Sequence, residues 1–158
     1  MKSIRVPPML TTIVQAGLLV CDGVSFNDCS GCPECGGRVS GYDTKKRSFA
    51  VIRENGRERN LIVTVKRFSC QSCGHIVNAD EPFYPMTRIG STVIDLCLTL
   101  ADTMPANRVA AWLDMMDIIV DRTTCRKYVK KMAWAVPSSP LFGESNPERL
   151  RGAMTRWY

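Results

Sequence analysis

The hydrophobic pattern in the first half of the chain is typical of β-strands. Residues 39–42, 48–53 and 60–68 form three runs that are rich in β-branched and aromatic residues. Glu54-Asn55-Gly56-Arg57 separates the last two runs, and Asn-Gly readily adopts the positive φ values of a type I′ turn. The pattern therefore predicts a β-hairpin. We expect the apolar residues 1–28 to add a strand or a short helix against it.

The second half of the chain has helical periodicity. Residues 91–102 are apolar at too many positions for a single stripe, so we expect this helix to be central. Residues 105–116 begin with a proline and place their apolar residues on one face. Asp121 is a typical N-cap for a third helix, whose apolar positions recur at helical spacing, at Cys125, Tyr128, Val129 and Met132.

Two CxxC pairs, each followed by glycine, carry the clearest chemical signal. They are Cys32-Pro33-Glu34-Cys35 and Cys70-Gln71-Ser72-Cys73. Each pair places two thiolates on one tight turn, and a hairpin between the pairs brings together the four ligands of a tetrahedral structural Zn²⁺. The 34 residues between the pairs are long for a zinc ribbon, and we expect the hairpin to hold the extra length. The predicted ligands of this one zinc ion are Cys32, Cys35, Cys70 and Cys73.

Two neighbouring residues are alternative ligands. Cys29 precedes Cys32 at the same spacing, and His75, the one histidine, directly follows the second pair. We interpret Cys29 as a loop thiol near the site and His75 as a surface residue. A redox function of the CxxC pairs is a further alternative, although no βαβ pattern surrounds either pair.

Positive charge is concentrated in two segments of the chain, whose net charge is +6. Residues 38–67 contain nine Lys and Arg against three acids, and a second cluster lies on the third predicted helix. Two such clusters favour a polyanionic partner over simple solvation of two faces. The predicted DNA contacts on the helix are Arg122, Thr123, Thr124, Arg126, Lys127, Lys130 and Lys131. On the hairpin they are Lys45, Lys46, Arg47, Arg53, Arg57 and Arg59.

The order of the elements predicts an α+β chain, a small β-hairpin zinc ribbon followed by a three-helix helix-turn-helix unit. We expect residues 1–78 to form the ribbon with an N-terminal extension, 79–90 a linker, 91–136 the helix-turn-helix domain, and 137–158 a linker or tail. The last helix of such a unit enters the major groove of DNA. The turn at residues 117–120 lacks the glycine that is common in this motif, and a plain three-helix packing unit is the alternative.

The combination of motifs resembles the N-terminal DNA-binding region of insertion-sequence transposases. The matching residues are Cys32, Cys35, Arg67, Phe68, Cys70, Cys73 and Gly74, followed by residues 120–129. The resemblance implies recognition of terminal inverted repeats by a zinc ribbon and a helix-turn-helix. Only 24 residues follow Trp134, too few for the acidic catalytic domain of a transposase. We therefore expect an orphan or truncated N-terminal module, or a small regulator built from the same parts.

These observations lead to one main hypothesis, a double-stranded DNA-binding protein that is not an enzyme. The alternatives are an RNA- or protein-binding zinc ribbon module and a transposase remnant that keeps some activity. Further partners to consider are a second copy of the chain and a separate transposase subunit. The N-terminal residues lack a signal-peptide pattern, and no apolar run approaches the length of a membrane span. We expect a cytoplasmic protein with no membrane partner.

Overall fold

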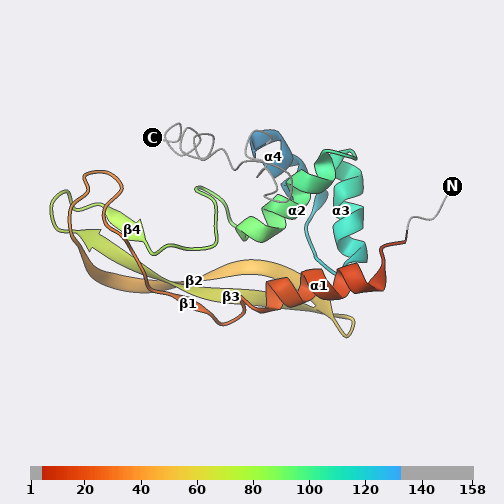
Figure 1. Cartoon of the computed structure of the whole chain (residues 1–158), viewed down its shortest axis with the longest axis horizontal. Coiled ribbons are helices and arrows are strands. Elements are labelled where there is room, and N and C mark those ends of the chain that lie inside the picture. Colours follow the sequence, from red (N-terminus) through yellow and green to blue (C-terminus); the bar gives the residue numbers. More distant parts are fainter. Residues whose placement is uncertain (1–4, 133–158) are drawn as a thin grey trace.

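The computed structural model describes residues 5–132 and shows a mixed α+β fold (Figure 1). These residues form a four-stranded sheet and four helices. In chain order they are α1 (Pro8–Leu19), β1 (Ser25–Phe26), β2 (Val39–Glu54), β3 (Arg57–Cys70), β4 (Ile76–Asn78), α2 (Ser91–Ala101), α3 (Ala106–Met115) and α4 (Arg122–Met132). The last four residues of the expected helical domain and the expected tail lie outside the described residues.

The predicted hairpin is confirmed as the antiparallel pair β2–β3, which forms a long ribbon (Figure 1). Asn55 and Gly56 connect the strands with φ values of 51° and 75°, as a type I′ turn requires. The expectation of separate strands at residues 39–42 and 48–53 was wrong, because both belong to the 16-residue β2. Residues 43–46 between them are polar and exposed on both faces of the ribbon, and they are strand through their backbone pairing with β3.

Short segments from elsewhere in the chain cover the edges of the ribbon. β1 pairs in parallel with β3 at Thr64 and Val65, and β4 pairs antiparallel with residues 67–69 of β3. The outer edge of β2 is bound near the hairpin turn by the segment between α3 and α4. There the N–H of Arg53 donates to the Asp117 carbonyl at 2.7 Å, and the N–H of Ile119 donates to the Val51 carbonyl at 2.8 Å.

The main hydrophobic core lies between the helices and the half of the ribbon next to its turn. Leu61 and Val63 of β3 are fully buried, whereas Ile62 between them points outward. The same cluster of buried residues includes Phe49 and Ile52 from β2, Leu18 from α1, Val93 and Cys97 from α2, and Val109 and Leu113 from α3. The core therefore joins segments that the sequence assigned to two domains.

The segment expected to be a linker contributes to this core. Ala79 and Phe83 are buried within it, and the Phe83 ring meets Phe49 edge to face at a centroid distance of 6.0 Å. The N–H of Gly90 donates to the Phe49 carbonyl at 2.7 Å. Residues 79–90 therefore hold the helices against the ribbon.

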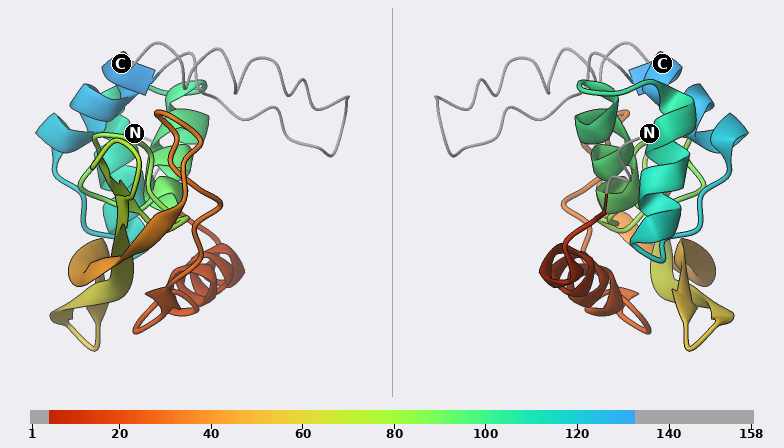
Figure 2. Two further views of the ribbon diagram at one scale, coloured as in Figure 1. Left: turned by 90° about the vertical axis from the view of Figure 1, so that its left-hand side faces the viewer. Right: turned by 90° about the vertical axis from the view of Figure 1, so that its right-hand side faces the viewer.

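α2, α3 and α4 pack on one another beside the ribbon (Figure 2). α2 buries Val93, Ile94, Cys97 and Leu98, which agrees with the expected central position. Asp121 caps α4 as predicted, since the N–H of Thr124 donates to its carboxylate at 2.9 Å. No helix among residues 5–132 has the length and apolar character needed to cross a bilayer.

Candidate metal centre and basic helix

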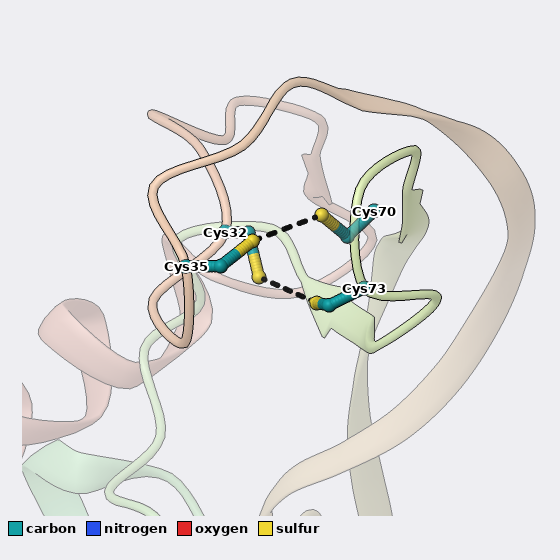
Figure 3. Close-up of side chains that lie close together, drawn as sticks. All are labelled: Cys32, Cys35, Cys70 and Cys73. Carbon is teal, nitrogen blue, oxygen red and sulfur yellow. Dashed lines mark hydrogen bonds between the residues drawn. The ribbon is translucent and has the colours of Figure 1, made fainter.

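The ribbon brings the two CxxC pairs together at the end opposite its turn. Cys32 and Cys35 lie in the loop before β2, and Cys70 is the last residue of β3. Because Val39 pairs with Cys70, the start of β2 lies directly beside the second pair. Figure 3 shows the four thiols converging, and all four Sγ atoms lie within 4.8 Å of one another. The four predicted ligand residues therefore form one cluster that can hold a metal ion.

The two CxxC segments fold into the same turn. The N–H of Gly36 donates to the Cys32 carbonyl at 2.8 Å, and that of Gly74 donates to the Cys70 carbonyl at 3.0 Å. Gly36 and Gly74 have φ values of 68° and 74°, a conformation that costs glycine little. A second backbone hydrogen bond closes each turn. The N–H of Cys32 donates to the Gly37 carbonyl at 3.1 Å, and the N–H of Cys70 donates to the His75 carbonyl at 2.9 Å. The site thus has approximate internal symmetry.

The sulfur positions fit a tetrahedral ion. Cys35 and Cys70 approach to 3.5 Å between Sγ atoms, and Cys32 and Cys73 approach to 3.6 Å. Four thiolates at about 2.3 Å from a central ion stand about 3.8 Å apart, close to these separations. Backbone N–H groups of Cys73 and Ser72 hold the pKa of Cys70 down to about 6. The N–H of Gly37 likewise stabilises the Cys35 thiolate, but the neighbouring thiols raise the pKa of Cys35 to about 12.

Cys29 and His75 do not belong to the group of four converging residues. The Cys29 thiol lies 3.6 Å from the Gly31 carbonyl oxygen, to which it donates. His75 is exposed and contributes its backbone to the second turn. Both residues thus occupy the places that the sequence analysis favoured for them.

α4 separates its apolar and charged residues onto two faces. Cys125, Tyr128 and Met132 are buried, whereas Arg122, Thr123, Arg126, Lys127 and Lys130 are exposed. Thr124 is half-buried and its hydroxyl bonds to Asp121, so its side chain belongs to the helix cap. The Asp121 carboxyl has a lowered pKa because the Thr124 hydroxyl and N–H both donate to it. Lys131 is half-buried.

Three of the predicted hairpin contacts form ion pairs within the chain. Arg47 pairs with Glu81 at 2.5 Å and lies 3.8 Å from the centre of the Phe83 ring. Arg53 pairs with Asp114 at 2.9 Å and with Asp117 at 3.5 Å. Arg59 pairs with Asp22 and Glu54. These arginines attach the ribbon to α3, to residues 79–90 and to the turn that follows α1, a role that the sequence analysis missed.

No family model, no curated protein and no solved structure matches this chain. The evidence for its function therefore comes from its own residues.

The other predicted hairpin contacts have no ionic partner among the described residues. Lys45, Lys46 and Arg57 are exposed and form no salt bridge within residues 5–132.

A groove of about 960 Å³ lies beside the metal centre, between the ribbon and residues 79–88. Lys45, Lys46 and Arg88 contribute positive charge to its lining. The N–H of Arg88 donates to the Tyr128 hydroxyl of α4 at 3.1 Å, which joins this part of the lining to the buried face of α4. The sequence contained no signal for Arg88, because its place in the groove depends on the packing of the ribbon, residues 79–88 and α4.

Proposed function

We propose that the chain binds double-stranded DNA through α4 and that a structural zinc ion holds the far end of the ribbon. The observation that carries the proposal is the division of α4 into a buried apolar face and an exposed face of Arg122, Thr123, Arg126, Lys127 and Lys130. Within residues 122–132 there is no acidic residue to balance these charges. Such a helix offers both base-reading side chains and phosphate contacts.

The connection between α3 and α4 supports a helix-turn-helix. Asp117 adopts a φ of 57°, the conformation that glycine commonly supplies in this motif and that Asp tolerates better than most residues. The turn is also hydrogen-bonded to β2 at Val51 and Arg53. The ribbon therefore fixes the position of the turn, and with it the start of α4.

Zinc is the metal that the donor set favours. Four cysteine thiolates in a tetrahedron are typical of structural zinc sites, and soft sulfur ligands disfavour magnesium and calcium. With four protein ligands the ion has no open position for a substrate, so we assign it a structural role. It would join the loop before β2 to the end of β3, where few apolar side chains are buried.

Lys45 and Lys46 of β2 and the nearby Arg88 are proposed as phosphate contacts. All three line the groove beside the metal centre. The ion-paired Arg47, Arg53 and Arg59 are proposed here as structural residues rather than DNA contacts. The proposed activity agrees with the resemblance to transposase DNA-binding regions, and it suits a transcription regulator equally well.

The decisive experiment is selection of a preferred duplex from random sequences, followed by binding measurements on variants of α4. Arg126→Ala should weaken binding to the selected duplex by about 1–3 kcal/mol and relax the preference at one base position. Lys130→Ala should weaken binding to all duplexes alike and reduce the salt slope by about one. Fluorescence anisotropy over a range of salt concentrations measures both effects.

Arg57→Ala is the matched control, because Arg57 is exposed at the hairpin turn and belongs to neither α4 nor the groove. It should leave the preference unchanged. Loss of only sequence-independent binding in Arg126→Ala would show that α4 is a basic surface and not a reader. Tighter binding to single-stranded RNA than to any duplex would favour the RNA-binding alternative.

A further inference from the structure

α1 is apolar on both of its faces. Leu18 on the inner face is fully buried, and Val14 and Leu19 pack against the core. On the outer face Met9, Ile13 and Val20 are 73%, 61% and 75% exposed. At 3.6 residues per turn these three side chains lie on one line along the helix, with the exposed Ala16 and Gly17 between them. We call this line of residues, Met9, Ile13, Ala16, Gly17 and Val20, the outer stripe.

α1 lies at the periphery of the molecule (Figure 2), and the five residues of the outer stripe are all exposed. It contains no polar side chain, and residues 8–20 contain no charged residue. Val24 and Ile62, which are 37% and 38% exposed, lie just beyond the end of α1, where Gly23 bonds to the Ile62 carbonyl. Contiguous exposed apolar surface of this kind marks an interaction site more often than isolated exposed residues do.

We propose that the outer stripe is the contact through which two copies of this chain form a dimer. The charge distribution favours this occupant. There is no Lys or Arg between Arg5 and Arg38, although the whole chain has a net charge of +6. Two copies can therefore approach through this region without the repulsion that their basic surfaces would cause. Interfacial membrane helices usually carry Lys or Arg beside their apolar face, and α1 carries none.

The shape of α1 suits pairing with itself. An isologous contact requires a surface that is complementary to its own copy, and one uncharged apolar stripe meets this requirement. Gly17 has no atom within 4 Å of the position where a Cβ would stand, so a second helix can approach closely there. α1 and α4 lie apart, α1 at the lower side and α4 at the upper side of the views in Figures 1 and 2, so this contact leaves the basic face of α4 uncovered.

The contact is small. α1 has 12 residues and is about 18 Å long, so two crossed copies bury less than the ~800 Å² per partner of a standard interface. We therefore expect a dimer that dissociates on dilution. The inference does not rest on DNA binding.

Sedimentation velocity of the full, metal-loaded chain, free of nucleic acid, tests the inference. Over about two orders of magnitude in concentration the wild type should change from monomer to dimer. Ile13→Asp places an unpaired charge in the stripe and should raise the dissociation constant about tenfold or more. Thr12→Asp adds the same charge at an exposed position beside the stripe, and it should behave as the wild type.

Equal melting temperatures and metal contents of the two variants would show that folding is unaffected. A wild type that stays monomeric at every concentration overturns the inference, as does an Ile13→Asp variant that dimerises as well as Thr12→Asp. Vesicles of phosphatidylcholine with phosphatidylglycerol provide a second test. A monomeric wild type that binds them through Ile13 would assign the stripe to a lipid surface and overturn the dimer.

Discussion

The two ends of the β2–β3 ribbon are held together in different ways. Near the turn, Phe49, Ile52, Leu61 and Val63 are almost completely buried beneath the helices. At the other end, residues 40–46 of β2 are all exposed. The four cysteines converge at this exposed end. We call residues 49–63 the helix-covered half, and residues 29–46 with 66–78 the cysteine half.

The difference shows how one hairpin can depend on two sources of stability. In the helix-covered half, burial of apolar side chains supplies the favourable free energy. The cysteine half buries few apolar side chains beyond Phe68, so its ordered turns require another source. Metal coordination supplies such a source in small ribbons, because the free energy of binding is also free energy of folding. The two halves should therefore respond to different perturbations.

Metal removal should give the largest effect, confined to the cysteine half. The free energy of zinc binding in small zinc-finger peptides is about 10–16 kcal/mol, far above what a few exposed strand residues provide. We expect a zinc chelator, or Cys70→Ser, to abolish backbone protection in residues 66–78 while α2, α3 and α4 stay protected. Hydrogen–deuterium exchange with mass spectrometry reports both regions, and elemental analysis should find about one zinc per intact chain.

Cys29→Ser is the control for this comparison, because Cys29 lies beside the centre but outside the group of four. It should keep the metal and the exchange pattern of the wild type. Unfolding of the entire chain on chelation would show that the two halves form one cooperative unit and do not have separate sources of stability.

Two glycine substitutions should separate the halves with intermediate effects. A Cβ at Gly90 would stand 2.2 Å from the Phe49 ring, so Gly90→Ala overpacks the core and should cost about 1–3 kcal/mol of unfolding free energy. A Cβ at Gly37 would stand 2.6 Å from the Ser72 hydroxyl and 3.1 Å from the Cys35 sulfur. Gly37→Ala should instead weaken metal affinity about 10–100-fold.

Urea denaturation of the metal-loaded protein and competition with a metal indicator measure these two quantities. Gly90→Ala should leave metal affinity unchanged. Adding Ser72→Gly to Gly37→Ala removes one clash and should restore part of the affinity. Equal effects of both substitutions on both quantities would show that the halves are coupled.

The sequence predicted those features of the two halves that depend on contacts between residues close together in the chain. The CxxC pairs with their glycines, the Asn55-Gly56 turn and the Asp121 cap each involve contacts within a few positions. The continuity of β2 through residues 43–46 was not predictable from hydrophobic pattern, because neither face of the strand is buried there. For residues 1–28 the pattern offered a strand or a helix, and the structure contains both α1 and β1.

The interactions of the arginines depended on contacts between distant segments. Arg47 meets Glu81 across 34 positions, and Arg53 meets Asp114 across 61. A run of positive charge indicates a basic surface equally well whether its side chains are free or paired. Only the packing of α3 and residues 79–88 against the ribbon distinguishes Arg53 and Arg47 from Arg57.

The smallest expected effect concerns the cap of α4, whose Cys125 is buried in the same core as the helix-covered half. Asp121→Ala removes the acceptor for the Thr124 N–H and should lower stability by about 1 kcal/mol without changing metal content. The folded-state pKa of Asp121 is depressed, so its stabilisation is complete above the unfolded value of about 3.9 and is lost as pH falls through the lower folded value. The difference in melting temperature between wild type and Asp121→Ala should therefore be constant near neutral pH and shrink below about pH 4. Asp121→Asn keeps a capping side chain without the titrating charge, so its stability relative to Asp121→Ala should not vary with pH in that range. A difference that grows on acidification would contradict the assignment of Asp121 as an ionised cap.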